Sequence, residues 1–213
     1  MSTIPHYCTI LANGKYPEHP IAHKSLARSD FIICCDGAIA ALDSDGLTPH
    51  KIIGDMDSIS PTMVEKYRDI LIQDTDQDSN DLEKAIFYSL SQNISKIDIV
   101  GATGLREDHT IRNIFLLTKF GSQIKDIRLL TDFGVFQPIS DEGTFTSFPG
   151  QQVSVFSPDP NLLIESVGLK YPLDKIPLTE IHSGTLNESI SDKFSISAPN
   201  GVVIVFTTYK GKS

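Results

Sequence analysis

Six aspartates stand close to glycines or at the ends of apolar runs in this chain. Two lie in the segment Gly54-Asp55-Met56-Asp57-Ser58, and two more in Asp76-Gln77-Asp78-Ser79-Asn80-Asp81. Clustered carboxylates repel one another unless a cation neutralises them, and their oxygens suit a hard ion such as Mg²⁺. A magnesium ion held by carboxylates usually also holds a phosphate. The pattern therefore indicates phosphate chemistry, and the acids in question are Asp36, Asp55, Asp57, Asp78, Asp81 and Asp108.

The Asp55–Asp57 pair follows an apolar run, Lys51–Ile53, that we predict to be a strand. Ligands of open parallel sheets bind at the carboxyl ends of the strands. On an extended segment, side chains two residues apart point the same way, so the pair could share one ion. The alternative is a solvated turn, since Asp, Gly and Ser are typical turn residues.

The second acidic segment leads into a helix that we predict over Asp81–Leu90. Asn80 is expected to cap this helix, with Glu83 completing a capping box. Capping and the helix dipole would explain Asn80 and Asp81 without any further role. They explain less well why three more aspartates, Asp74, Asp76 and Asp78, stand just before Asn80.

The third motif is Gly101-Ala102-Thr103-Gly104-Leu105-Arg106-Glu107-Asp108-His109, between a predicted strand and a helix over Asp108–Thr118. A glycine loop before a helix N-terminus is suited to phosphate, and the Arg106 guanidinium adds a fork of donors. The motif is neither a Walker A loop nor a full Gly-x-Gly-x-x-Gly. The alternative is a tight turn with Asp108 as the helix N-cap.

Strands and helices must alternate in the first 130 residues for these motifs to meet. Short apolar runs without polar alternation are typical of parallel strands covered on both faces. We therefore expect an α/β fold with a mainly parallel sheet in Rossmann-like layers, whose loops converge at one edge. The expected strands are Tyr7–Leu11, Phe31–Cys35, Lys51–Ile53, Ile70–Ile72, Ile97–Val100 and Ile127–Leu130.

The composition changes after about residue 131, where Gly, Pro and Ser become frequent. Short β-type segments between turn clusters favour an antiparallel sandwich or barrel. They are Gln152–Ser157, Leu162–Leu169, Phe194–Ser197 and Val202–Thr208. We predict two domains, an α/β domain over residues 1–132 and an all-β sandwich over residues 133–213.

Charge and cysteine content limit the partners and the compartment. The net charge of −9 and the pI of about 5.0 disfavour a nucleic-acid partner. The odd set Cys8, Cys34 and Cys35 does not form a disulfide framework and favours the reducing cytoplasm. Met1–Thr9 has no signal-peptide character, and no apolar run approaches the ~20 residues of a membrane helix. We expect neither a membrane nor a nucleic-acid partner.

Together these motifs resemble the thiamine pyrophosphokinase family. The resemblance covers nearly the whole chain in the family's order. Its N-terminal part rests on Asp36-Gly37-Ala38, Gly54–Ser58, Asp76–Asp81 and Gly104–His109. Its C-terminal part rests on Gly168-Leu169-Lys170-Tyr171-Pro172-Leu173 and Gly184-Thr185-Leu186-Asn187-Glu188.

The resemblance implies transfer of the pyrophosphoryl group of ATP to the hydroxyl of thiamine, giving thiamine diphosphate and AMP. It implies a catalytic α/β domain that binds ATP and Mg²⁺, and a β-sandwich for thiamine binding and dimerisation. It also implies a homodimer whose thiamine pocket lies between the subunits.

Residue roles follow from the same resemblance. Asp55, Asp57 and Asp81 would hold Mg²⁺, and Asp36 and Asp108 would complete a catalytic ring of acids. ATP contacts would come from Ser58, Asp78, Asn80, Arg106 and His109. Thiamine contacts would come from Gln77, Thr185, Leu186 and Asn187.

Two departures keep other functions open. Leu186 stands where the family usually has Ser, and the chain has no Trp. One alternative is therefore a pyrophosphokinase acting on another hydroxymethyl heterocycle, such as a pterin. Another is a non-catalytic protein that binds thiamine or a nucleotide.

Overall fold

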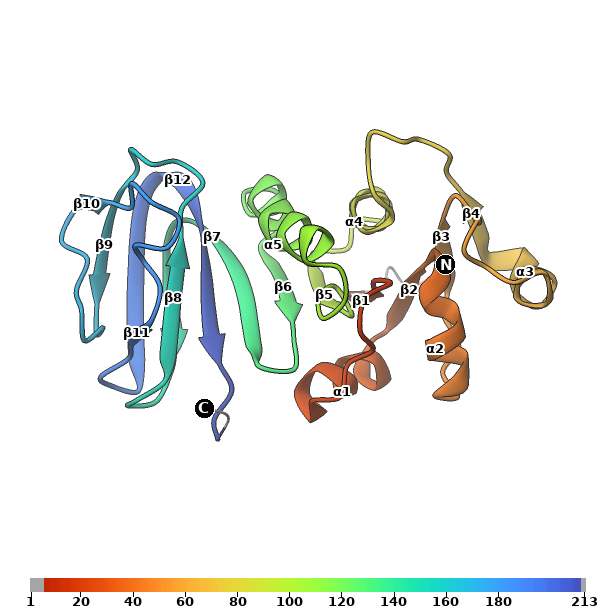
Figure 1. Cartoon of the computed structure of the whole chain (residues 1–213), viewed down its shortest axis with the longest axis horizontal. Coiled ribbons are helices and arrows are strands. Elements are labelled where there is room, and N and C mark those ends of the chain that lie inside the picture. The colour runs from red at the N-terminus through yellow and green to blue at the C-terminus, as the bar shows by residue number, and fades with distance from the viewer. Residues whose placement is uncertain (1–5, 212–213) are drawn as a thin grey trace. The chain divides into compact units, whose positions relative to one another are not determined.

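The computed structural model describes residues 6–211 and is shown in Figure 1. The beginning of Met1–Thr9 and the outer ends of the two predicted domains lie outside the described residues. The chain divides into two compact units. The first, called the α/β unit, takes Met1–Ile114 and Leu129–Asp132; the second, called the β unit, takes Phe115–Arg128 and Phe133–Ser213. Each is described by itself.

The α/β unit is built on a parallel sheet with the strand order β4-β3-β2-β1-β5. The strands β1, β2, β3 and β5 are buried along most of their length, which explains why they appear in the sequence as mainly apolar runs. The edge strand β4 is only partly buried. The predicted α/β fold with parallel strands is confirmed. The strands are β1 (Tyr7–Leu11), β2 (Phe31–Cys35), β3 (Lys51–Gly54), β4 (Leu71–Gln73) and β5 (Lys96–Val100).

Helices cover both faces of this sheet. The helix α4 (Asp81–Ser91) contacts β1, β2 and β3 on one face, and α1 (Pro20–Arg28) contacts β1 and β5 on the other (Figure 1). The division between the units passes through α5 (Glu107–Phe120) and β6 (Asp126–Leu130). The shorter helices are η1 (Asp36–Ala38), α2 (Ile39–Ser44), α3 (Pro61–Tyr67) and η2 (Arg68–Ile70).

The predicted start of α4 is confirmed, whereas that of α5 is wrong by one residue. Asn80 Oδ1 accepts a hydrogen bond of 3.0 Å from the Glu83 backbone N–H, so Asn80 caps α4. Because α5 begins at Glu107, Asp108 lies inside its first turn and is not the N-cap. An acid is favourable at either position, through capping or the helix dipole, so the pattern alone could not separate them.

The β unit is built around one long antiparallel pair, β7 (Gly134–Thr146) with β12 (Lys193–Thr208). The register shifts between Ala198 and Val202, where the Asn200 backbone N–H donates to Asp141 Oδ1 over 2.8 Å. This bulge divides the pair into two halves.

Each half of β12 carries a different neighbour on its free edge. Residues 195–197 pair with β9 (Leu163–Val167), and residues 204–207 pair with β8 (Gln152–Phe156). The short strands β10 (Ile176–Pro177) and β11 (Asn187–Glu188) extend β9 and β8. One apolar core includes Val155 of β8, Ile164 of β9, and Ile196 and Val203 from the two halves of β12. The predicted all-β C-terminal region is confirmed.

Two further findings concern the described residues as a whole. Among residues 6–211, no helix is long and apolar enough to cross a membrane. Cys8, Cys34 and Cys35 are all buried free thiols.

Candidate active site

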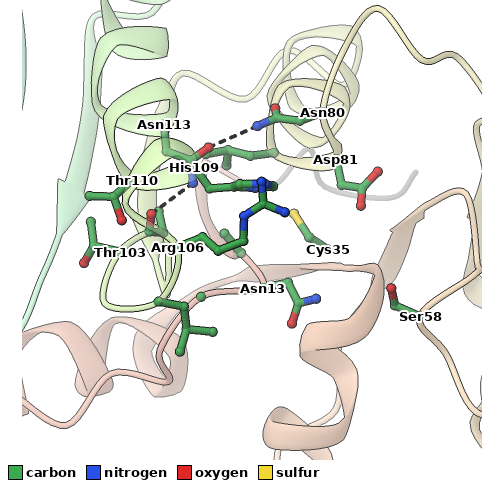
Figure 2. A pocket seen from close by; sticks show the side chains of 15 residues that line it. Asn13, Cys35, Ser58, Asn80, Asp81, Thr103, Arg106, His109, Thr110 and Asn113 are labelled. Carbon is green, nitrogen blue, oxygen red and sulfur yellow. Dashed lines mark hydrogen bonds between the residues drawn. The ribbon is translucent and has the colours of Figure 1, made fainter.

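A pocket of about 360 Å³ opens where the strands of the α/β unit end (Figure 2). Each of its walls comes from a segment that follows a strand or begins a helix. They are Ala12–Gly14 after β1, Cys35 at the end of β2, Ser58 after β3, Asn80–Leu82 at the start of α4, and residues of the 102–113 segment. This is the edge at which the sequence motifs were expected to converge.

Backbone contacts between two loops form one side of the pocket. The Gly14 N–H donates to Gly101 O over 2.6 Å, and the Lys15 N–H donates to Thr103 O over 2.9 Å. A Cβ atom at position 14 would collide with the carbonyl oxygen of Gly101, so only glycine allows this approach. The loops after β1 and β5 are therefore held against each other.

Asn113 joins two walls of the pocket and was missed by the sequence reasoning. Its Oδ1 accepts a bond of 3.0 Å from Asn80 Nδ2, and its Nδ2 donates to Ala102 O over 2.9 Å (Figure 2). The side chain is buried. The available signal was a polar residue inside a predicted helix, between Ile111 and Ile114.

Three aspartates come together beside the pocket. One carboxylate oxygen from each of Asp36, Asp55 and Asp57 lies within 4.8 Å of the other two. Asp36 is only 2% exposed, and its Oδ1 has no hydrogen-bond partner among the described residues. When Asp36 is ionised, its buried oxygen without a partner is unfavourable, so a proton or a bound cation would stabilise it. An all-carboxylate set of this kind fits a hard divalent ion.

Gly54 allows this cluster to form. A Cβ atom at position 54 would lie 2.6 Å from the Cβ of Asp36. Any larger residue would push the end of β3 away from the buried carboxylate. The glycine of the Gly-Asp-x-Asp motif is therefore required by the lack of space beside Asp36.

The acids of the cluster differ in proton affinity. The pKa of Asp36 is raised to about 6, chiefly by burial and to a smaller extent by the neighbouring Asp55 and Asp81. The pKa of Asp55 is lowered, chiefly because the Asp57 backbone N–H stabilises the carboxylate. The environment therefore stabilises the ionised form of Asp55 and the protonated form of Asp36.

The geometry of the Asp55–Asp57 segment differs from the expectation. Met56 has a positive φ of 73°, and the Asp57 N–H donates to Asp55 Oδ1 over 3.2 Å, so the segment is a turn rather than extended. The left-handed conformation is unfavourable for a residue with a side chain. The two carboxylates nevertheless approach Asp36 from the same loop.

Asp81 lies outside the three-carboxylate cluster at the start of α4. Its Oδ1 is 3.7 Å from the ammonium nitrogen of Lys84. Burial is the main cause of its raised pKa, which the ammonium partly offsets. In the preceding loop, Asp78 is exposed and Gln77 Nε2 donates to Thr75 O over 3.3 Å.

Arg106 and Asp108 form an ion pair at the rim of the pocket. Arg106 Nε and Nη2 donate to the two carboxylate oxygens of Asp108 over 3.1 and 2.6 Å. This pairing lowers the pKa of Asp108 to about 2. Arg106 and His109 line the pocket together with Ser58, whose Oγ donates to Asp57 Oδ1 over 2.8 Å.

The remaining predicted residues lie in the β unit. Leu186 is 81% exposed and has a positive φ of 59°, while Thr185 Oγ1 donates to His182 O over 2.7 Å. Asn187 is buried; its Oδ1 accepts from the Tyr171 N–H and its Nδ2 donates to Tyr171 O. Asn187 thus fixes the loop of the Gly168–Leu173 motif.

Comparisons with known sequences cover both units. A family model described as "Thiamin pyrophosphokinase, catalytic domain" matches residues 22–130, and one described as "Thiamin pyrophosphokinase, substrate-binding domain" matches residues 134–206. A Bacillus subtilis (strain 168) protein named thiamine pyrophosphokinase is 31% identical over 180 residues, which cover 79% of this chain and 82% of that protein. A protein of Oryza sativa subsp. japonica named thiamine pyrophosphokinase 1 is 30% identical over 156 residues, covering 61% and 58% respectively.

Solved structures show the same fold. The crystal structure of a thiamin pyrophosphokinase family protein from Enterococcus faecalis superimposes with a TM-score of 0.81. The match covers 96% of this chain and 99% of that chain at 22% identity. At this identity the likeness concerns the fold alone.

Proposed function

The chain belongs to the thiamine pyrophosphokinase family, and on this premise we propose that it transfers the pyrophosphoryl group of ATP to the hydroxyl of thiamine. The products are thiamine diphosphate and AMP. The observation that carries the proposal is the Asp36–Asp55–Asp57 cluster with its unpartnered buried oxygen, beside a pocket lined by Cys35 and Ser58. These two residues flank the cluster in sequence, so the pocket and the acids are neighbours.

The proposed cation is Mg²⁺, which Asp55, Asp57 and Asp81 would hold. Asp36, which has a carboxylate oxygen within 4.8 Å of oxygens of Asp55 and Asp57, would complete the catalytic ring of acids together with Asp108. When bound, the cation neutralises charge on the triphosphate and on the leaving AMP. The observation in support is the Asp36–Asp55–Asp57 cluster, which contains two of the three proposed ligands and offers carboxylate oxygens only.

We assign phosphate and nucleotide contacts to the residues around the pocket. Phosphoryl-type transfer needs positioning and charge neutralisation more than covalent help. The guanidinium of Arg106 supplies a second positive group, and Asp108 orients it through two hydrogen bonds. The proton of the attacking hydroxyl passes to a carboxylate of the acidic ring. The other proposed ATP contacts are Ser58, Asp78, Asn80 and His109.

The thiamine side of the site is proposed for Gln77 and for the Thr185–Asn187 segment. Residues 1–132 would form the catalytic domain, and residues 133–213 the thiamine-binding and dimerisation domain of a homodimer. Leu186 supports this assignment, because an apolar side chain that is 81% exposed offers a surface for a heterocycle. The three buried free thiols support a role in the reducing cytoplasm.

The test is product analysis with purified protein, Mg-ATP and thiamine. We expect AMP and thiamine diphosphate in equal amounts, separated by chromatography. Formation of ADP, or binding of thiamine in a calorimeter without turnover, would refute the proposal. A parallel reaction with a hydroxymethylpterin should give little product. Faster turnover of the pterin than of thiamine would identify the pterin, and not thiamine, as the substrate.

A further inference from the structure

Lys84 is a buried lysine in the first turn of α4, and the proposed reaction assigns it no role. Its side chain is only 5% exposed. Burying an ammonium group is unfavourable unless oxygen atoms surround it. A lysine in this position, next to a proposed metal ligand, therefore requires an explanation.

The oxygen partners of Lys84 come from both ends of one segment, Asp74–Asp81, which we call the acidic segment. Lys84 Nζ donates to the backbone carbonyl of Asp74 over 2.7 Å, directly after β4. It also lies 3.9 Å from Asp74 Oδ1 and 3.7 Å from Asp81 Oδ1. One ammonium thus contacts the entry and the exit of the segment.

The acidic segment has few other attachments. It holds four aspartates in eight residues, and the four residues in its middle, Thr75–Asp78, are exposed. Within the segment, the Asp76 N–H donates to Asp74 Oδ1 over 3.0 Å. Its middle also contacts α5 through a long hydrogen bond of 3.5 Å, which Arg112 Nη2 donates to Asp78 O. Its ends are fixed by the Asp74 N–H on Gly54 O at 2.8 Å and by the Asn80 cap. The like charges repel one another, so the segment needs a nearby positive group.

We propose that Lys84 is the positioning residue of the acidic segment, whose ammonium holds both ends in place while no cation is bound. Asp81 then already occupies its position when the divalent ion and the nucleotide arrive. Preorganisation of this kind removes an ordering cost from binding. The inference rests on the proposed function only for the identity of the cation.

The primary test is hydrogen–deuterium exchange of the cation-free protein in EDTA, followed in peptides that span Asp74–Lys84. Lys84→Met keeps an unbranched apolar side chain but removes the charge, and Lys84→Arg keeps the charge. Lys24→Met, at an exposed lysine of α1, is the matched control. We expect exchange at least about tenfold faster in Lys84→Met, near-wild-type exchange in Lys84→Arg and no change in the control.

Added Mg²⁺ distinguishes positioning from simple packing. Saturating Mg²⁺ should restore slow exchange in Lys84→Met, because the ion would neutralise Asp81, one of the two carboxylates that Lys84 contacts. It should change the wild type little. Wild-type exchange in cation-free Lys84→Met would overturn the proposal. So would faster exchange spread equally over β1 and β2, because that would report general destabilisation. If Lys84→Met does not fold, Lys84→Gln replaces it with the same expectations.

Kinetics give a second readout. In Lys84→Met the Mg²⁺ concentration for half-maximal turnover should rise about fivefold or more, with kcat at saturating Mg²⁺ within about threefold of wild type. A loss of kcat with unchanged Mg²⁺ dependence would refute the positioning role. If the wild type itself shows no turnover, the proposed function fails while the exchange experiment still decides the role of Lys84.

Discussion

Replacing Asp36 with Asn should stabilise the cation-free protein at neutral pH. Asp36 is 2% exposed, its Oδ1 has no hydrogen-bond partner among residues 6–211, and it faces Asp55. Asn has nearly the same shape and carries no charge. It can still accept the 3.5 Å hydrogen bond that the Ser58 N–H donates to Asp36 Oδ2.

The size of the effect follows from the pKa of Asp36, which is raised, chiefly by burial, from 3.8 to about 6. The folded protein therefore binds this proton more tightly than the unfolded chain does. Below pH 3.8 the carboxyl is neutral in both states and contributes nothing. As the pH rises from 3.8 to about 6 the wild type loses stability, which at 1.36 kcal/mol per pH unit amounts to roughly 3 kcal/mol.

The Asp36→Asn variant avoids this loss but brings an amide N–H pair into the place of the unpartnered oxygen. That group costs ~1–2 kcal/mol, so the net gain above pH 6 should be about 1–2 kcal/mol. The difference between variant and wild type should therefore change by roughly 3 kcal/mol between about pH 3.5 and about pH 7.5. At the acidic end the wild type should be the more stable protein.

The assay is urea unfolding in EDTA at several pH values, with Asp36→Asn compared to wild type. Asp30→Asn, at an exposed aspartate after α1, is the control and should show no such pH dependence. Added Mg²⁺ should stabilise the wild type more than Asp36→Asn. A stability difference that is constant with pH would refute the prediction, and so would a variant less stable than wild type at neutral pH. Either result would show that the buried Asp36 carboxylate does not destabilise the folded protein.

Three further predictions concern the proposed reaction and the β unit. Asp57→Asn should lower kcat by at least about 100-fold at an unchanged melting temperature, because it removes a carboxylate from the proposed cation site; surviving turnover would refute that role. Asn113→Leu should raise KM for ATP and lower the unfolding free energy by about 2 kcal/mol, since it breaks both links between the pocket walls. Leu186→Gly should stabilise the protein by ~1 kcal/mol in urea, because glycine tolerates the φ of 59°, while KM for thiamine rises and KM for ATP stays the same.

The sheet of the α/β unit could be predicted because its strands carry a local signal. Tyr7–Leu11 and Phe31–Cys35 coincide with β1 and β2, since parallel strands buried on both faces need apolar residues at consecutive positions. The Asn80 cap was equally local. From strand order alone the motifs after these strands had to share one edge, and the structure brings Asp36, Asp55 and Asp57 together there.

Features that depend on distant contacts could not be predicted. The strand β7 contains Gly134, Pro138 and Gly143, all weak strand formers, and exists because β12 pairs with it. Asn113 and Lys84 have their roles only because other loops place carbonyl and carboxylate oxygens around them. The positive φ of Met56 is likewise a conformation that its residue type does not indicate.

The long β7–β12 pair also determines when the β unit can acquire its structure. Residues 147–192 lie between its two strands, so the pairing closes a long loop, which is slow because chain entropy is lost before contacts form. Both β8 and β9 depend on β12 for their partner edge. During synthesis they emerge before it and must wait with open strand edges, a state prone to aggregation. The α/β sheet β1–β5 has no such dependence, and so nascent chains should need protection mainly in the interval between β8 and β12.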